Sequence, residues 1–357
     1  MPYRKNVFVI GAGASVHCGA PIMTNFIETA REIMDSGRLD ADEAIRFRRV
    51  FEYRAQNDGT EKNARVDLSN LEELFGLIDL HIRVEPKLYY LRLDLIFLIA
   101  KTLEKTIDIR KSGQQCQILY HDAGSNRWAE RPRNITPFQN FVDIVARRWS
   151  PKPPGGIAED TIISLNYDTL IERAMEAQET EPDYALAGFP SSPTPKRVIK
   201  LLKLHGSSNW AICAKGEHVQ VSPSDTQVET IESMTCPHCE MAMEPFIVPP
   251  SWSKGEHREV LAPVWQAAFE ALTNSRRWIL AGTSLPETDR FLRYLFGLAL
   301  QENKELDRIL ILNPAESGYN ELFKNLPSRI SLEHRKDTFE YVACQFLPRV
   351  RHSINFF

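Results

Sequence analysis

The segment Val7–Ser15 constrains the fold of this chain more than any other. Four apolar residues, Val7–Ile10, lead directly into Gly11-Ala12-Gly13-Ala14-Ser15. This order predicts a buried strand, a turn of small residues and the start of a helix. Small residues let a backbone approach a phosphate, and the N–H groups at a helix start attract it. Because Ser15-Val16 stand before His17 without the third glycine of the usual fingerprint, a tight turn packed for its own sake is the alternative.

Four later apolar runs are similar to the first: Thr161–Leu165, Ile199–Leu204, Trp278–Ala281 and Arg308–Leu312. Each is short, lacks polar alternation and ends at a turn, which is typical of fully buried parallel strands. Helical patterns follow two of them, at Asp168–Ala177 and Thr288–Leu300. This alternation predicts an α/β protein with a Rossmann-like, doubly wound parallel sheet, whose ligand lies beyond the carboxyl ends of the strands.

The stretch from about 38 to 150 has a helical pattern instead. Ser69-Asn70-Leu71-Glu72 predicts a capping box before a helix that reaches Ile82. Further helices are expected over Leu88–Ile107 and from Thr136-Pro137 to Trp149. Proline-rich stretches predict loops at Ser150–Gly156 and Phe189–Lys196. The predicted domains are a nucleotide-binding domain (1–37 and 155–345), a helical insertion (38–150) and, within the former, a small ribbon-like lobe (206–255).

The composition excludes several classes of function. A chain of 357 residues, 43% of them hydrophobic, can bury a full core. Its net charge of -4 gives no electrostatic footprint for nucleic acid or an anionic membrane. The apolar run Leu91–Ala100 is too short to span a bilayer, and Met1–Asn6 leaves no room for a signal peptide. We therefore expect a cytoplasmic protein with no membrane or direct nucleic-acid contact, and six cysteines that are free thiols apart from one candidate metal pair.

Polar residues end the second and third predicted strands. Asn166 and Asp168 follow the second strand, where they can orient a ribose or a carboxamide. Equally, both can simply cap the helix that follows. His205 ends the third strand and is followed by Gly206. Histidine titrates near neutrality and a neighbouring glycine lets a substrate approach, whereas a satisfied structural histidine is the alternative.

The fourth and fifth predicted strands end in a similar way. Gly282-Thr283-Ser284 follows the fourth strand and offers hydroxyl groups for phosphate or ribose oxygens. Asn313-Pro314 follows the fifth. Turn chemistry alone explains either one. Because parallel strands end at one edge of a sheet, all of these residues are expected to converge there.

In order, the motifs GAGAS, SLNYD, KLHGS, a single C-x-x-C, AGTS and LNP resemble the sirtuin family. They resemble more closely its divergent bacterial branch, many of whose members degrade NAD as effectors of antiviral defence. The resemblance covers roughly 1–35 and 155–315. Within the helical stretch only Glu72–Phe75 contributes, and it resembles the divergent branch alone.

The resemblance implies an NAD pocket. Gly11, Ala12, Gly13 and Ser15 would cradle the pyrophosphate, with Gly282, Thr283 and Ser284 on the phosphate side and Asn313 near the adenosine ribose. Asn166 and Asp168 would hold the nicotinamide ribose and carboxamide, and His205 would act on the ribose hydroxyls as catalytic base. Such groups suit cleavage of a glycosidic bond, which needs an oriented leaving group and a polarised ribose.

Two departures from the family pattern concern the acyl-lysine substrate and the metal. Sirtuin deacylases carry an arginine after a glycine-isoleucine-proline segment, but Gly19-Ala20-Pro21 leads into Ile22-Met23-Thr24-Asn25-Phe26. Deacylases hold zinc with two C-x-x-C pairs, whereas here only Cys236 and Cys239 form one. Cys213 and His218 can complete a tetrahedral site. The expectation from the sequence is nevertheless a metal-free relic with reduced thiols.

The resemblance and its departures together imply an NAD hydrolase that releases nicotinamide and ADP-ribose as the effector of an antiphage system. By analogy, homo-oligomers are expected, as is a defence partner such as a HerA-type ATPase or an Argonaute-like protein. Two alternatives stay open: an NAD-dependent protein deacylase, and a module that senses NAD or ADP-ribose without turnover.

Overall fold

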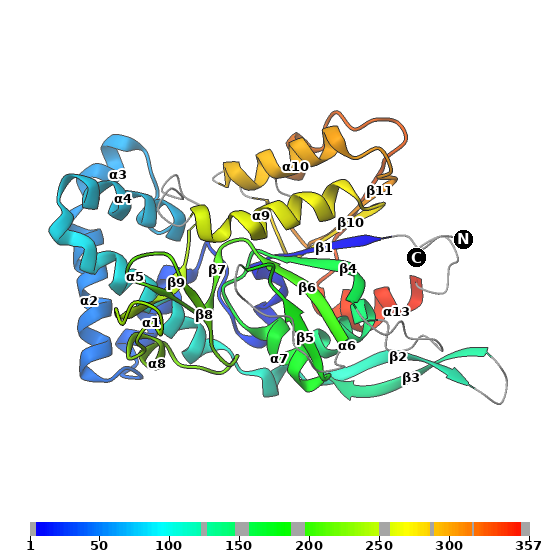
Figure 1. The fold of residues 1–357 in the computed structure, drawn as a ribbon, viewed down its shortest axis with the longest axis horizontal. Coiled ribbons are helices and arrows are strands. Elements are labelled where there is room, and N and C mark those ends of the chain that lie inside the picture. Colours follow the sequence, from blue (N-terminus) through cyan, green and yellow to red (C-terminus); the bar gives the residue numbers. More distant parts are fainter. Residues whose placement is uncertain are drawn as a thin grey trace. The chain divides into compact units, whose positions relative to one another are not determined.

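The computed structural model in Figure 1 describes residues 5–122, 127–146, 157–186, 197–249, 258–285, 289–315 and 318–350. The proline-rich stretches 150–156 and 189–196 lie outside these residues. The chain forms two compact units. The first comprises Met1–Cys18, Asp108–Leu204 and Leu261–Phe357, and the second comprises Gly19–Ile107 and His205–Val260. The domain limits expected from the sequence stay a prediction.

A seven-stranded parallel sheet forms the centre of the first unit, in the order β12-β11-β10-β1-β4-β6-β5. The strands are β1 (Asn6–Ile10), β4 (Ile157–Ser164), β5 (Thr180–Asp183), β6 (Arg197–Lys203), β10 (Arg277–Ala281), β11 (Arg308–Leu312) and β12 (Ser331–Arg335). This confirms the predicted Rossmann-like sheet. The apolar runs predicted β1, β4, β6, β10 and β11. The edge strands β5 and β12 are polar and partly exposed, so they carry no such run.

Helices cover both faces of this sheet (Figure 1). They are α6 (Pro137–Ala146), α7 (Leu170–Ala177), α9 (Arg258–Thr273), α10 (Arg290–Glu302), α11 (Tyr319–Leu322), α12 (Phe339–Tyr341) and α13 (Leu347–Val350), with a π-helical turn, η5, over Val342–Phe346. Phe8 of β1 packs edge-on against Phe141 of α6 at 5.3 Å between ring centroids. Val7 precedes Phe8 in β1, so its side chain points to the opposite face of the sheet. Trp278 of β10 is paired with Val7, and on that opposite face its ring packs on Phe296 of α10. The sheet is therefore doubly wound.

The segment after β1 does not lead directly into an α-helix, although the start of a helix was predicted there. Two short 3-10 helices follow β1, namely η1 (Ala12–Ala14) and η2 (Val16–Cys18), and the first α-helix begins only at Phe26. The helix prediction at this place was therefore wrong. A short 3-10 turn has a much smaller dipole than a long helix, so it attracts a phosphate less strongly.

A β-hairpin interrupts the stretch predicted to be entirely helical. Strands β2 (Gln114–Asp122) and β3 (Arg127–Ile135) pair in antiparallel fashion and belong to the first unit. The hairpin connects a last 3-10 turn, η4 (Ile109–Ser112), to α6. At the end of β3, Thr136 and Gln139 exchange hydrogen bonds between side chain and backbone, which caps α6 as a capping box. The predicted continuation of this helix to Trp149 lies beyond the described residues.

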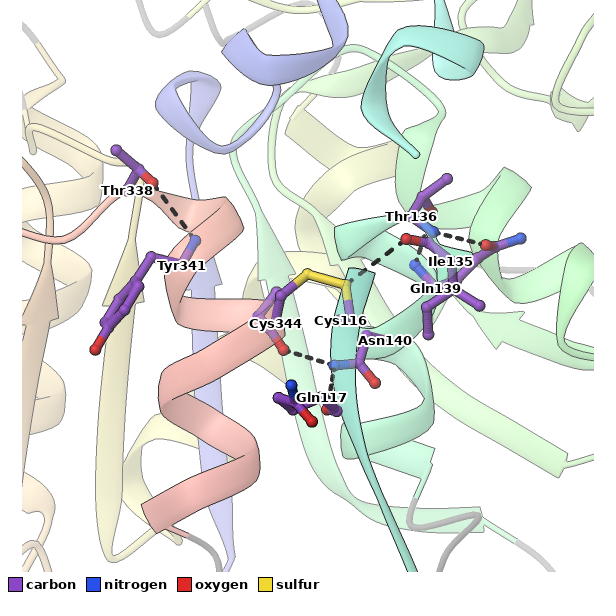
Figure 2. Close-up of a disulfide and its surroundings, with 10 residues drawn as sticks. Cys116, Gln117, Ile135, Thr136, Gln139, Asn140, Thr338, Tyr341 and Cys344 are labelled. Carbon is purple, nitrogen blue, oxygen red and sulfur yellow. Dashed lines mark hydrogen bonds between the residues drawn. A yellow bond between two sulfur atoms is a disulfide. The ribbon is translucent and has the colours of Figure 1, made fainter. Parts of the chain in front are cut away.

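A disulfide joins the hairpin to the carboxyl-terminal helical segment (Figure 2). Cys116 of β2 pairs with Cys344 of η5, 228 residues further along the chain. Asn140 of α6 donates its side-chain amide to the carbonyl of Ala343 at 2.8 Å and so braces the same segment. The prediction of free thiols was wrong for this pair, because spacing does not show which distant cysteines meet. The other four cysteines are free.

The second unit combines helices with a small antiparallel sheet. Its helices are α1 (Phe26–Asp35), α2 (Ala41–Gln56), α3 (Asp58–Ala64), α4 (Leu71–Val84), η3 (Pro86–Leu88), α5 (Tyr89–Thr106) and α8 (Val228–Glu232). Its sheet has the order β8-β7-β9, with β7 (Gly206–Cys213), β8 (Val219–Val221) and β9 (Met243–Ile247). Asn70, rather than the predicted Ser69, caps α4 by accepting from the N–H of Glu72. In the described part of the chain, no helix is both long and apolar enough to cross a membrane.

Buried charge connects the two parts of this unit. The Lys101 ammonium on α5, of which 3% is exposed, bonds Glu104 at 2.6 Å and Glu229 of α8 at 2.5 Å. On α2, Arg46 bonds Glu232 at the end of α8 at 2.6 Å. Paired charges thus join the long helices α2 and α5 to the short helix α8, which lies between β8 and β9 in the sequence.

Candidate functional site

The loops that follow β1 and β10 lie against each other at the carboxyl edge of the sheet. The N–H of Gly11 donates to the carbonyl of Ala281, and the N–H of Gly13 donates to that of Gly282 at 2.7 Å. Gly282 has φ +63°, and a Cβ there would lie 2.2 Å from the nitrogen of Ala14. Only glycine fits such a position. Close packing of the two loops is therefore one reason for their small residues. This agrees with the alternative interpretation of the sequence, a tight turn packed for its own sake.

The loop that follows β4 joins this arrangement through a buried polar network. The Ser15 hydroxyl donates to Oδ2 of Asp168 at 2.7 Å. The Asn166 amide donates to the carbonyl of Gly11 and to the Ser15 hydroxyl, both at 3.1 Å. Four of the predicted site residues, Gly11, Ser15, Asn166 and Asp168, are thus brought together.

The hydrogen bonds that the side-chain oxygens of this network accept, or do not accept, indicate where a ligand can bind. Oδ1 of Asp168 accepts from the N–H of Leu170, so Asp168 also caps α7, as the alternative interpretation proposed. Both of its oxygens are therefore engaged within the protein. The side-chain oxygen of Asn166 is buried and has no hydrogen-bond partner among the described residues. Because a buried acceptor without a donor is unfavourable, this oxygen is the natural contact for a ligand N–H or O–H group.

A buried ion pair that the sequence did not predict lies next to the same loop. The Lys203 ammonium donates to the backbone carbonyl of Asp168 at 2.6 Å and to Glu172 at 2.7 Å. Only 1% of the Lys203 side chain and 4% of that of Glu172 are exposed. Burial raises the pKa of Glu172, and the Lys203 charge opposes that rise. Lys203, at the carboxyl end of the predicted strand, was the available signal.

The ends of β10 and β11 are joined as well. The Asn313 amide donates to the carbonyl of Thr283 at 2.8 Å and to the Tyr319 hydroxyl at 3.0 Å. The Thr283 hydroxyl accepts from the N–H of Leu285. Thr283 and Asn313 are buried, whereas Ser284 is exposed. Thr283 and Asn313 therefore hold the loops in place, and Ser284 presents itself at the surface.

His17 follows Val16, which stands at the place of the third glycine, and belongs to an aromatic cluster. Its ring stacks on Phe138 at 5.4 Å and on Phe339 at 5.9 Å between centroids. Burial lowers the pKa of His17, although Glu340 and Asp168 act against this. A neutral imidazole ring packs well between aromatic rings, so His17 has a structural role beside the β1 loop.

His205 is the first residue after the third boundary between the units along the chain, two residues beyond β6. Its side chain is 3% exposed, and its carbonyl accepts from the N–H of Val248 at 2.9 Å. Gly206 has φ +74°, and a Cβ there would lie 2.1 Å from the carbonyl oxygen of Phe246. The glycine beside His205 is thus required by the approach of β9 to β7.

The second unit gathers the candidate metal ligands. The ligand atoms of Cys213, His218 and Cys236 all lie within 4.8 Å of one another, and Cys239 packs against the same cluster. Burial by itself would raise the pKa of the Cys213 thiol, but N–H groups of Glu217 and His218 and the His218 ring lower it to about 6. Three sulfurs and an imidazole are a donor set that fits tetrahedral zinc.

This geometry favours zinc more strongly than the sequence did, and we expect one zinc ion per purified chain. Cys236→Ser should remove most of the zinc and lower the melting temperature, because metal-binding energy at such a site is folding energy. Elemental analysis of freshly purified protein measures the content. Cys18→Ser, which changes a free buried cysteine of the other unit, serves as the control and should keep its zinc. Purified protein that contains no zinc would instead support the metal-free relic expected from the sequence.

Comparison with known proteins gives a family match over part of the chain. Residues 160–325 match the model of the SIR2-like domain. No curated protein matches the chain. Solved structures that are similar include a mutant of Sir2 homologues with 2'-O-acetyl-ADP-ribose (15% identity, 98% of this chain and 93% of the other, TM-score 0.46). A Sir2 homologue–NAD complex has 15% identity, covers 98% and 91%, and has a TM-score of 0.44. A Sir2 homologue mutant with ADP-ribose has 14% identity, covers 99% and 95%, and has a TM-score of 0.48.

Proposed function

We propose that this protein is an NAD hydrolase that cleaves NAD to nicotinamide and ADP-ribose. The observation that carries the proposal is the buried network of Ser15, Asn166 and Asp168 at the carboxyl edge of a doubly wound sheet, where such folds bind ligands. The SIR2-like match over 160–325 supports it, since Asn166, Asp168 and His205 all lie within that range.

Each part of the site has a proposed role. The loop Gly11–Ser15 and the loop Gly282–Ser284 hold the pyrophosphate, and Asn313 lies near the adenosine ribose. Asn166 contacts the nicotinamide ribose with its unpartnered oxygen. Because both oxygens of Asp168 already accept hydrogen bonds, its role with the carboxamide requires either that it accept a further bond or that the Ser15 hydroxyl turn away.

The proposed reaction transfers the ribosyl group to water. The bond between the ribose anomeric carbon and the nicotinamide nitrogen breaks, and its electron pair leaves with nicotinamide. Water adds to the anomeric carbon and loses one proton, so ADP-ribose forms. His205 accepts a proton from a ribose hydroxyl as general base, that ribose oxygen takes up the proton that the water loses, and His205 then releases its proton to solvent, so one proton leaves in all. The network around Asn166 orients the leaving group and the ribose before the bond breaks.

Acyl-lysine peptides are expected neither to be consumed nor to accelerate NAD cleavage. The segment after Gly19-Ala20-Pro21 lacks the arginine that deacylases use to position nicotinamide and acceptor. Mass spectrometry of an acetyl-lysine peptide library, incubated with the protein and NAD, is the measurement. An authentic sirtuin deacylase on the same library is the positive control. If O-acetyl-ADP-ribose and deacetylated peptide appear together, the protein is a deacylase.

The same incubation separates the third alternative. A module that senses NAD or ADP-ribose would bind the nucleotide and release no nicotinamide in any mixture. Release of nicotinamide without peptide supports the hydrolase, and binding without release supports the sensor.

For the biological role, we propose a cytoplasmic effector of antiphage defence. An unregulated NAD hydrolase would empty its own cell, so its activity must be gated by assembly into homo-oligomers or by a partner such as a HerA-type ATPase or an Argonaute-like protein. Cellular NAD, measured after phage infection with and without the gene, tests this role. Constant NAD in infected cells would contradict it.

A further inference from the structure

Helix α10 carries apolar residues on the side that faces away from the sheet. Phe291, Tyr294 and Leu298 are 42%, 60% and 56% exposed, although the same helix buries Leu292, Leu295, Phe296 and Ala299. The exposed residues are spaced three and four apart, so they form one stripe along the helix. The rings of Phe291 and Tyr294 contact each other at 6.4 Å between centroids. A contiguous exposed stripe of this kind is typical of an interaction surface.

We propose that this stripe binds the α10 stripe of a second copy of this chain, with the two helices antiparallel. In an isologous antiparallel pair, a residue a given number of positions before the two-fold axis contacts, in the other copy, the residue that lies the same number of positions after the axis. With the axis beside Phe296, Tyr294 of one copy meets Leu298 of the other. The exposed Arg290 at one helix end then faces the exposed Glu302 at the other end. The same register thus pairs Tyr294 with Leu298 and Arg290 with Glu302, and the two-fold symmetry makes each of these pairs occur twice.

The residue nearest the axis on the exposed side is suited to a close crossing. Gly297 is exposed, and a Cβ built on it would meet nothing within 4 Å. Bare backbone at the crossing point lets the axes of two packed helices approach each other closely, since interaxial distance depends on the side chains at the contact. Charge register and the small central residue together favour a second copy over an unrelated partner.

One helix face buries less area than a standard interface, so the association is expected to be weak and to depend on concentration. Sedimentation velocity and light scattering of the full chain, from about 1 to about 100 µM, should show a change from monomer to dimer. Tyr294→Glu and Leu298→Glu should each weaken the dimer at least about tenfold by placing a charge in the stripe. Val84→Glu is the matched control, because it places the same charge at a residue that is 73% exposed on α4. Thermal unfolding checks that each variant is folded.

Charge reversal tests the antiparallel register itself. Arg290→Glu and Glu302→Arg should each weaken the dimer, and the double variant should restore it, because the two charges then exchange places across the axis. Gly297→Cys should give a disulfide-linked dimer under mild oxidation. A chain that stays monomeric at the highest concentration overturns the proposal. So does a dimer that Tyr294→Glu leaves intact or that the double reversal fails to restore. None of these readouts depends on NAD, so the proposal stands or falls apart from the proposed activity.

Discussion

His205→Ala and Asn166→Ala are each expected to lower the rate of NAD hydrolysis by roughly 10²–10⁴-fold, the usual effect of removing a catalytic base or a group that positions the reactants. Asn166 lies in the buried network with Ser15 and the Gly11 carbonyl, so its loss removes both an oriented ligand contact and a link between the β1 and β4 loops. His205 is the proposed base, and its removal should leave NAD binding close to normal. Initial rates of nicotinamide release measure turnover, and calorimetry measures binding.

Two matched variants control for general damage. His81→Ala removes a histidine that bonds Tyr53 on α2, and Asn274→Ala removes an asparagine that bonds the Glu270 carbonyl at the end of α9. Neither belongs to the proposed site, so both should hydrolyse NAD at nearly the normal rate. Near-normal hydrolysis by His205→Ala would remove His205 from the catalytic set. A wild-type protein that binds NAD and releases no nicotinamide would favour the sensing module.

The sheet could be predicted because its central strands are buried on both faces. Val7–Ile10 and Arg308–Leu312 are continuous apolar runs, and such runs need no knowledge of their partners to be recognised. The same logic placed Asn166, Asp168 and Asn313 at one edge, and the hydrogen bonds between neighbouring loops agree with it. These residues follow from topology alone.

The features that were not predicted depend on partners far away in the sequence. The Cys116–Cys344 disulfide brings residues 228 apart together, and no local pattern encodes that meeting. Likewise, a sequence pattern identifies small residues after β1 but not whether a helix or a 3-10 turn follows, because the contact with Gly282 decides the backbone path. Tertiary contacts override local propensity at such places.

Cys213 and His218 show a third case. The sequence offered Cys213 and His218 as possible partners of the single C-x-x-C pair, and the turn between β7 and β8 brings the His218 ring to 3.8 Å from the Cys213 sulfur. Spacing rules for zinc sites assume a fixed order of ligands, whereas the fold can supply a ligand from any residue that the turn presents.

Lys203→Met is expected to lower the free energy of unfolding by about 3–5 kcal/mol, because it leaves the Glu172 carboxylate buried without its counter-charge. Urea unfolding of the full chain measures the change. The exposed pair Lys62–Asp58 provides the comparison: Lys62→Met should change the same quantity by at most roughly 0.5 kcal/mol. A loss below roughly 1 kcal/mol in Lys203→Met would mean that Glu172 becomes protonated at little expense or that water reaches it.

The double variant Lys203→Met/Glu172→Leu separates the stability of the pair from its effect on the site. Replacing both charges by apolar groups should recover most of the lost stability. About 1–3 kcal/mol should stay lost, because the buried carbonyl of Asp168 no longer has the Lys203 ammonium as donor. If that bond also fixes the loop that carries Asn166 and Asp168, NAD turnover should stay low in the refolded double variant while its stability returns. Recovery of both together would make the ion pair structural only.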